Sequence, residues 1–185
     1  MFPHFRYIML IISIKDIAKK EQHTHAHKLL RECLKKYNIN YNEETKINKT
    51  EMGKPSLADY PEIKYNISHA DGIASCIVTD KECGIDCEQI RPYRPNVVKR
   101  AFSDEEKILL ENTPDEEKNM MFFRLWTLKE SYVKAIGTGI SYPLNTVSFS
   151  FENGKIKSNI KNFKFKQYII KSKYAVSVCI KETDS

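Results

Sequence analysis

The chain has 185 residues, enough for one domain or two small lobes, and its 41% hydrophobic content with only 6 Gly and 7 Pro excludes a disordered or collagen-like protein. The longest apolar run, residues 7–12, is far shorter than the roughly 18 residues that span a bilayer, so we expect neither a membrane anchor nor secretion. Five Cys without a C-x-x-C pair favour the reducing cytoplasm over a disulfide framework or a thiolate zinc site, and a net charge of +6 predicts an anionic partner.

The first half of the chain carries the apolar patterns of four strands and one helix. The spacing of Leu29, Leu30, Cys33 and Leu34 places four apolar side chains on one helical face. We predict the helix over residues 27–37 and the strands over residues 6–14, 63–67, 73–79 and 83–90.

The second half begins with a predicted linker, because two prolines within residues 91–95 disfavour regular structure. Ser103 with Glu106 three residues later matches a capping box that begins a helix, and a longer helix follows over about residues 116–136. Residues 155–180 predict two or three strands, partly at a sheet edge. This irregular alternation of strands and helices indicates an α+β fold rather than a doubly wound sheet.

Two carboxylates share one face of the strand predicted over residues 83–90. Asp86 and Glu88 are two residues apart, so they project to the same side at about 7 Å, while Ile85 and Cys87 face the other way. Parallel carboxylates repel one another unless a cation lies between them, and oxygen ligands of this kind suit Mg²⁺. The ordinary alternative is a pair of solvated acids on an edge strand.

A second pair of charged residues lies on the long helix. Glu130 points away from the apolar face of this helix, and Lys134 follows one turn later on the same side, near Trp126. The pair is either a simple ion pair four residues apart or a third carboxylate beside an ammonium that meets phosphate oxygens.

Further polar residues occupy predicted loop positions earlier in the chain. Lys54 and Pro55 are typical of a surface turn, and Ser68 with His69 follows a predicted strand, where a histidine usually has a structural role. An alternating set of histidines without a nearby Cys or acid pattern is interpreted as a helix entrance rather than a metal site: His23, His25 and His27.

Five motifs in chain order resemble those of 4′-phosphopantetheinyl transferases of the surfactin-synthetase-activating (Sfp) type: G-K-P at 53–55, N-I-S-H at 66–69, G-I-D-C-E at 84–88, F-S-x-x-E at 102–106 and W-T-L-K-E-S-Y-V-K-A-I-G-T-G at 126–139. The resemblance covers about residues 28–149. It implies Mg²⁺-dependent transfer of 4′-phosphopantetheine from coenzyme A to a serine of an apo acyl or peptidyl carrier protein, which releases adenosine 3′,5′-bisphosphate. It also implies two similar α+β lobes in a pseudo-twofold arrangement.

The resemblance assigns roles residue by residue. It implies that Mg²⁺ is held by Asp86, Glu88 and Glu130. It implies that Lys134 contacts the coenzyme A phosphates together with Ser68 and His69, and that Lys54 and Pro55 hold the adenine and its ribose phosphate. We expect Glu130, Lys134 and His69 to be catalytic, with Glu130 as the base for the carrier serine. Glu106 matches the acidic residue of the F-S-x-x-E motif, which lies near the site in the family. Its role in a capping box with Ser103 explains its presence equally well.

The expected division lies between residues 83 and 84, giving an N-terminal lobe (1–83) on the coenzyme A adenine side and a C-terminal lobe (84–185) that binds Mg²⁺. The segment ahead of Lys28 is shorter than in typical members, so we expect a shortened N-terminal lobe. We expect a monomer whose positive charge suits an acidic carrier, with no nucleic acid or membrane as partner.

Three alternatives remain open. The chain could be a Mg²⁺-dependent nucleotide-diphosphate hydrolase or a non-catalytic member of the family that binds coenzyme A. It could also be a nucleic-acid-binding module that uses the lysines of residues 155–173, whose ordinary interpretation is a solvated edge.

Overall fold

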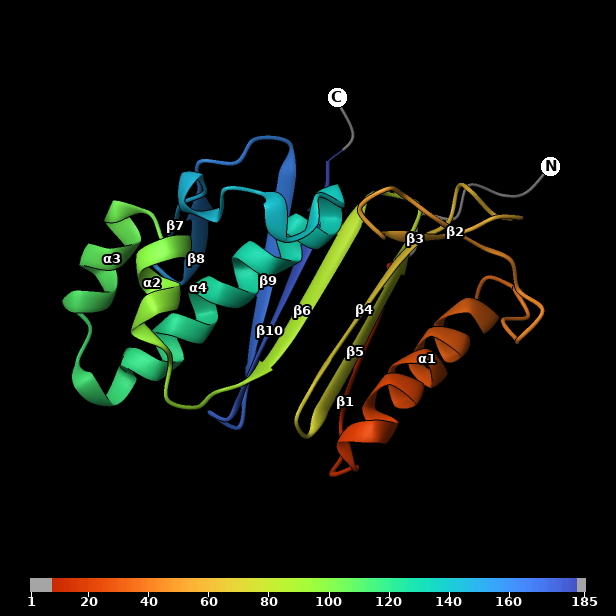
Figure 1. Cartoon of the computed structure of the whole chain (residues 1–185), viewed down its shortest axis with the longest axis horizontal. Helices are drawn as coiled ribbons and strands as arrows, with labels where there is room; N and C mark the ends of the chain where they lie inside the picture. The colour runs from red at the N-terminus through yellow and green to blue at the C-terminus, as the bar shows by residue number, and fades with distance from the viewer. Residues whose placement is uncertain (1–7, 183–185) are drawn as a thin grey trace.

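The computed structural model describes residues 8–182, with the backbone alone at position 140 (Figure 1). The first half of the chain forms one antiparallel sheet of three strands in the order β1-β5-β4, covered by a helix. Its elements in chain order are β1 (Met9–Ile14), α1 (Lys19–Lys35), the short pair β2 (Ile47–Lys49) and β3 (Pro55–Leu57), β4 (Lys64–Ala70) and β5 (Ile73–Thr79).

The second half repeats this plan with additional helices. Its antiparallel sheet has the order β6-β10-β9, which matches β1-β5-β4 element by element. The elements are β6 (Cys83–Gln89), α2 (Pro95–Ala101), α3 (Asp104–Glu111), α4 (Asp115–Ile136), the 3₁₀ turns η1 (Gly139–Ser141) and η2 (Leu144–Thr146), the pair β7 (Phe149–Glu152) and β8 (Lys155–Ser158), β9 (Phe163–Ile170) and β10 (Tyr174–Lys181). The predicted α+β fold with two similar lobes is confirmed.

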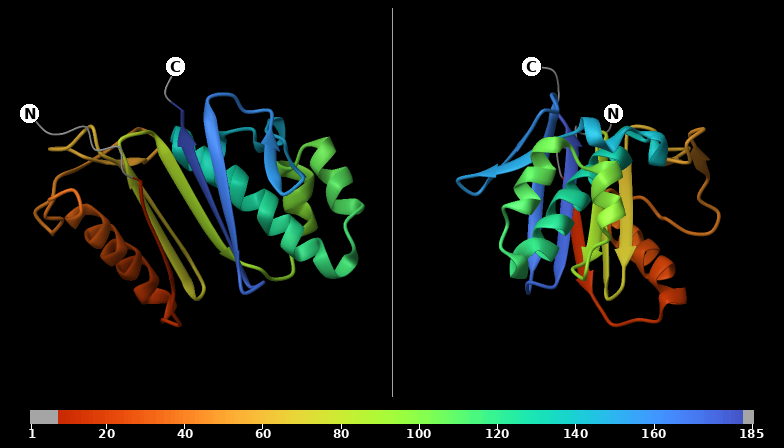
Figure 2. Two further views of the ribbon diagram at one scale, coloured as in Figure 1. Left: turned by 180° about the vertical axis from the view of Figure 1, so that it is seen from behind. Right: turned by 60° about the vertical axis from the view of Figure 1, so that its left-hand side comes forward.

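The molecule is layered, with α1 on one side, the two sheets next to each other and α4 on the other side (Figures 1 and 2). Three apolar clusters hold the layers together. One lies between α1 and the first sheet, another surrounds α4, and the third joins the two sheets through fully buried Ile77, Ile85 and Val176. Helices α2 and α3 pack beyond α4 (Figure 1). None of the helices within residues 8–182 is long and apolar enough to cross a membrane.

Side chains, rather than a ladder of backbone bonds, join the neighbouring strands β4 and β6, which belong to different sheets. The backbone N–H of Ile85 donates to Asn66 Oδ1 at 2.9 Å, and that of Cys87 donates to Ser68 Oγ at 3.2 Å. Asn66 and Ser68 are both buried. They provide acceptors for two backbone N–H groups of β6, which would cost folding free energy if they were buried without a hydrogen bond. We call this pair of bonds the β4–β6 clasp.

Most predicted elements are confirmed, including the capping box of Ser103 and Glu106. The predicted start of the first helix at residue 27 is wrong, because α1 begins at Lys19. The predicted linker contains the start of α2, in which Pro95 takes the first helical position, where a proline loses no intrahelical hydrogen bond. Ser68 and His69, expected in a loop after a predicted strand, lie in β4. The part of the first predicted strand over residues 6–7 lies outside the described residues.

Candidate active site

A glycine brings β6 against the last turns of α4. A Cβ atom on Gly84 would overlap the backbone carbonyl of Ser131 and come within 2.5 Å of the backbone N of Ala135. Only a residue without a side chain allows this approach. Asp86 and Glu88, which follow on the same face of β6, are thereby carried to the face of α4 that holds Glu130 and Lys134.

Asp86 is the most enclosed of the predicted ligands, with 5% of its surface exposed. Its Oδ1 accepts hydrogen bonds from Lys134 Nζ at 2.6 Å and from Ser68 Oγ at 3.1 Å. Its Oδ2 is buried and has no hydrogen-bond partner within the described part of the chain. Because a buried carboxylate oxygen without a partner is costly, Asp86 is suited to a further positive ligand.

Ser68 uses its full hydrogen-bonding capacity in this cluster. The hydroxyl donates to Asp86 and accepts from the backbone N–H of Cys87 and from Lys134 Nζ, the latter at 3.0 Å. Burial disfavours the Lys134 ammonium, but the attraction of Asp86 outweighs this effect and raises the pKa of Lys134 above its usual value. Lys134 is therefore a fixed positive charge between the two lobes.

The other two acids lie within electrostatic reach of Asp86. Burial, together with repulsion from Asp86 and Glu88, raises the pKa of Glu130 to about 7, although Lys134 partly offsets the shift. Burial and Asp86 raise the pKa of Glu88 as well, opposed by Arg91, which donates to Glu88 Oε2 at 3.0 Å. A cation between the three carboxylates would relieve the repulsion that contributes to these raised pKa values.

These residues fit a hard divalent cation. No three His, Cys, Asp or Glu side chains within residues 8–182 are gathered closely enough to hold a metal ion by themselves. Mg²⁺ does not require such a cluster, since it usually keeps several waters and binds one or two carboxylates together with substrate phosphates. The unpartnered Oδ2 of Asp86 is a ligand of this type, with Glu88 and Glu130 as neighbouring acids.

His69 follows Ser68 on β4 and is exposed. Partial burial lowers the pKa of His69, and the nearby charges of His23 and Lys134 lower it further. Its ring centroid lies 5.9 Å from that of His23, which in turn lies 4.5 Å from that of His27. The interpretation of these histidines as a helix entrance is wrong, because they lie inside α1; His25 faces elsewhere and bonds Ser13 at 2.9 Å.

Lys54 lies at the end of α4, away from the carboxylates. Its ammonium donates to the backbone carbonyl of Ala135 and pairs with Glu82 Oε2 at 2.5 Å. A cation at this position satisfies a free carbonyl and complements the helix dipole. Pro55, the first residue of β3, follows directly. The structure thus brings Ser68, Asp86 and Lys134 into contact but makes no such contact between them and Lys54.

A buried ion pair that the sequence did not reveal holds α3 to α4. Glu106 Oε2 lies 2.7 Å from Lys129 Nζ, and both side chains are fully buried. Glu106 also closes the capping box with Ser103 and accepts from the backbone N of Phe149 at 3.0 Å. Of the two interpretations of Glu106, the capping box is confirmed. Lys129 follows Leu125 by four residues on the core face of α4, which is the signal that could have predicted its burial.

The model of the 4′-phosphopantetheinyl transferase superfamily matches residues 82–179, more than half of the chain. The chain belongs to this superfamily. Similar proteins include the 4′-phosphopantetheinyl transferase gsp of Aneurinibacillus migulanus, 38% identical over 57% of this chain and 44% of that protein, and Sfp of Bacillus subtilis (strain 168), 31% identical over 72% and 62%. The solved holo-(acyl-carrier-protein) synthase of Bacillus anthracis str. Ames in complex with CoA (3′,5′-ADP) is 19% identical over 56% of this chain and 96% of that one, with a TM-score of 0.48.

The chain spans about half the length of the curated superfamily members it matches. The family model covers β6 to β10 and therefore includes Asp86, Glu88, Glu130 and Lys134. Ser68 and His69 lie on β4, outside this match.

Proposed function

We propose that the chain transfers 4′-phosphopantetheine from coenzyme A to a serine of an apo acyl or peptidyl carrier protein in a Mg²⁺-dependent reaction that releases adenosine 3′,5′-bisphosphate. The observation that carries this proposal is the contact of Asp86, Ser68 and Lys134, beside two further acids whose pKa values are raised. Superfamily membership and the relatives named as 4′-phosphopantetheinyl transferases support it.

The proposed metal ligands are Asp86, Glu88 and Glu130. When bound, Mg²⁺ would neutralise the pyrophosphate of coenzyme A and lower the energy of charge developing on its oxygens. The unpartnered Asp86 Oδ2 supports a cation here. Lys134 supplies a fixed positive charge for the same phosphates. We keep His69 as a proposed phosphate contact: its exposed ring lies 5.9 Å from that of His23 on α1, and Lys134 is near enough to lower its pKa.

We assign the proton of the carrier serine to Glu130. Asp86 is bonded to Lys134 and Ser68, and Glu88 is paired with Arg91. Among the residues described, Glu130 accepts no hydrogen bond and forms no ion pair, so one oxygen of its carboxylate remains to take a proton when the other faces the proposed cation. Its half-buried position on α4 leaves it open toward an incoming substrate.

The proposed roles of Ser68, Lys54 and Pro55 take account of the hydrogen bonds that Ser68 and Lys54 already make. Because Ser68 already makes three hydrogen bonds, we propose that it holds Lys134 and Asp86 in position as well as lying near the phosphates. For Lys54 and Pro55 we propose contact with the adenine and ribose phosphate through the lysine stem and the proline ring, since the Lys54 ammonium is held by Ala135 and Glu82.

The proposal extends to the carrier partner, the cellular location, the oligomeric state and the lobe boundary of the protein. We propose an acidic carrier, because a chain of net charge +6 attracts one, and a cytoplasmic monomer. We retain a lobe boundary between residues 83 and 84; the turn before β6 and the repeated sheet order support it.

A mass measurement tests the proposed activity. The protein is incubated with Mg²⁺, coenzyme A and each of several apo carrier proteins, and every carrier is weighed before and after. We expect a mass gain equal to one phosphopantetheine on the carrier serine, and none on a carrier whose serine is replaced by alanine. Hydrolysis of coenzyme A without carrier modification would favour a hydrolase. Binding of coenzyme A without any reaction would favour a non-catalytic family member.

A further inference from the structure

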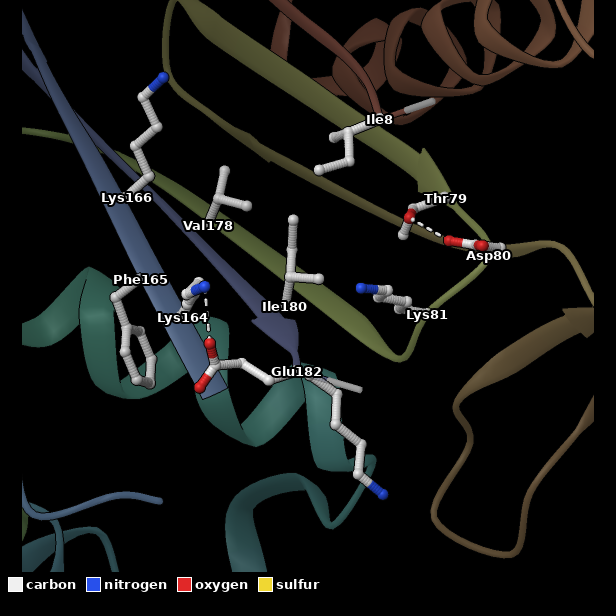
Figure 3. Close-up of a pocket in the computed structure, with 11 residues that line it drawn as sticks. Ile8, Thr79, Asp80, Lys81, Lys164, Phe165, Lys166, Val178, Ile180 and Glu182 are labelled. Atoms are coloured by element: carbon white, nitrogen blue, oxygen red, sulfur yellow. Dashed lines mark hydrogen bonds and ion pairs between the residues drawn. The ribbon is translucent and has the colours of Figure 1, made fainter. Parts of the chain in front are cut away.

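A cavity of about 900 Å³ opens between the two sheets, at the ends of β5, β9 and β10 that lie near the described termini of the chain (Figure 3). It is separate from the candidate active site, whose residues do not line it. Its apolar lining comes from Ile8, which is 56% exposed, from the partly buried Ile180 and from the buried Val178.

The alternation of side chains along β9 explains the hollow. Tyr168 and Ile170 pack between the two sheets. Lys166 and Lys164 are two and four residues before Tyr168, so they lie on the same face of β9. At this end of the space between the sheets, lysines take positions that apolar residues fill further along. Their exposed side chains leave Ile180 of β10 partly covered, whereas Val178 is buried.

The register of the strands places these lysines beside the apolar residues of the cavity. Lys166 is directly opposite Val178, and Lys164 is opposite Ile180. Lys81 points into the same space from the turn between β5 and β6 (Figure 3). Apolar side chains surrounded by ammonium groups suit a ligand that has both an apolar part and a negative charge.

The charges that line the cavity do not cancel. Four lysines stand against two acids, of which Glu182 is already paired with Lys164 at 2.7 Å. Asp80 accepts a hydrogen bond from Thr79 Oγ1 at 3.3 Å. Within residues 8–182, Lys81, Lys166 and Lys181 are in no ion pair, since the nine ion pairs of the described chain include none of them. The cavity therefore attracts an anion.

We propose that this cavity binds a medium-chain fatty acid, with the alkyl chain against Ile8 and Ile180 and the carboxylate near Lys81, while Lys166 adds to the positive charge of the lining (Figure 3). A volume of this size accommodates such a chain. The charge balance favours a carboxylate over a neutral or cationic amphiphile. The site would give the protein a lipid-binding activity that is independent of the transfer reaction.

Titration calorimetry with dodecanoate, below the concentration at which it forms micelles, tests this proposal. We expect saturable binding to one site, and a loss of affinity of about tenfold or more in a Lys81→Glu/Lys166→Glu variant. The matched control is Lys155→Glu/Lys157→Glu, which reverses two lysines of β8 outside the cavity and should bind as the unaltered protein does. Butyrate, which lacks the long tail, and dodecyltrimethylammonium, which has the opposite charge, should both bind weakly.

Independent measurements keep the test decisive if the charge-reversed variant folds poorly. Dodecanoate should slow amide hydrogen exchange in the unaltered protein at residues 79–81 and 164–166, and excess coenzyme A should not displace it. Equal affinity in both double variants, equal binding of dodecyltrimethylammonium, or displacement by coenzyme A would overturn the proposal. Binding to phosphatidylglycerol vesicles without binding of dodecanoate would overturn it in favour of a membrane surface. The proposal would also be wrong if the charge-reversed variant aggregates and dodecanoate leaves amide hydrogen exchange in the unaltered protein unchanged. The lysines would then serve to protect the sheet edge from aggregation.

Discussion

Lys134 Nζ donates to Asp86 Oδ1 at 2.6 Å, so an ammonium of α4 and a carboxylate of β6 hold each other at the centre of the candidate site. This contact spans two elements that are far apart in sequence, and its geometry depends on the close packing of β6 against α4. The same two residues are those to which the proposed chemistry assigns a phosphate contact and a metal ligand. Substitution of each residue in turn distinguishes the two roles.

Replacement of Lys134 by alanine should lower turnover strongly, in addition to the destabilisation expected when Asp86 loses its cation. The substitution removes the positive charge that we propose meets the coenzyme A phosphates, and loss of one such group typically costs about 10²- to 10³-fold in kcat. Steady-state kinetics of carrier modification measure the effect. Lys118→Ala on the same helix, which breaks only the exposed pair with Asp115 at 2.7 Å, is the control and should leave turnover unchanged. Equal effects of the two substitutions would contradict the role of Lys134.

Asp86→Asn should abolish the response of the protein to Mg²⁺. The unaltered protein should be stabilised by about 2.7 kcal/mol when the ion is present at a hundred times its dissociation constant, because the ion binds the folded state. Thermal unfolding in the presence of Mg²⁺ or EDTA measures this without any substrate. Asp104→Asn, which alters an exposed acid 90% accessible to solvent, should keep the full response. A normal Mg²⁺ response in Asp86→Asn would exclude Asp86 as a ligand.

Gly84→Ala should destabilise the protein and disturb the site together. The new methyl group would overlap the backbone of α4 at Ser131 and Ala135, and overpacking of this kind costs about 3 kcal/mol when the neighbours are backbone atoms. Urea denaturation measures the free energy of unfolding. Gly154→Ala is the control, because Gly154 has a positive φ of 75° but no atom near the new methyl group, so only the backbone strain of about 1 to 2 kcal/mol applies. A smaller loss at Gly84 than at Gly154 would contradict the close approach.

Lys129→Met should cost about 3 to 5 kcal/mol of folding free energy, because it leaves the buried Glu106 carboxylate without its cation. A double variant, Glu106→Gln/Lys129→Met, should recover part of this loss, since no uncompensated charge remains. The control is Lys107→Ala, which breaks an exposed pair with Asp104 and should cost less than about 1 kcal/mol. Chemical denaturation of all three compares them. A loss in Lys129→Met no larger than that of the exposed pair would show that the buried pair is not important for stability.

The β4–β6 clasp predicts different effects for its two members. Asn66→Ala should cost about 1 to 3 kcal/mol of stability, because the buried N–H of Ile85 loses its acceptor. Ser68→Ala should cost a similar amount and also lower kcat, since Ser68 additionally bonds Asp86 and Lys134. Denaturation and kinetics measured on the same preparations separate the two roles. A kcat that falls equally in both variants would mean that the bonds of Ser68 to Asp86 and Lys134 add nothing to catalysis beyond the clasp itself.

The sequence predicted the parts of the site that depend on local periodicity. The two-residue repeat of a strand correctly placed Ile85 and Cys87 in the core, opposite Asp86 and Glu88, and the helical repeat placed Glu130 and Lys134 together on one face of α4. The capping box of Ser103 was equally local and equally predictable. These relationships need no knowledge of the tertiary fold.

Contacts between distant segments were not predictable in the same way. The Lys54 ammonium reaches the end of α4, and Lys129 reaches Glu106, because of how whole elements pack; no spacing within one element encodes either contact. The helix α2 was missed because seven residues beginning with a proline are too short to show a helical repeat. The assignment of Ser68 and His69 to a loop failed because polar side chains usually mark a loop, whereas here the side chains of Asn66 and Ser68 replace strand pairing.

The repetition of one topology in both halves has a stoichiometric consequence. The strand of the first half that corresponds to β6 is β1, and Met9–Ile14 contains no acidic residue, whereas β6 carries both Asp86 and Glu88. The duplicated architecture therefore contains a single set of acids, with the first half contributing the serine of β4 to it. We expect each chain to bind one equivalent of coenzyme A, not two, despite its internal symmetry.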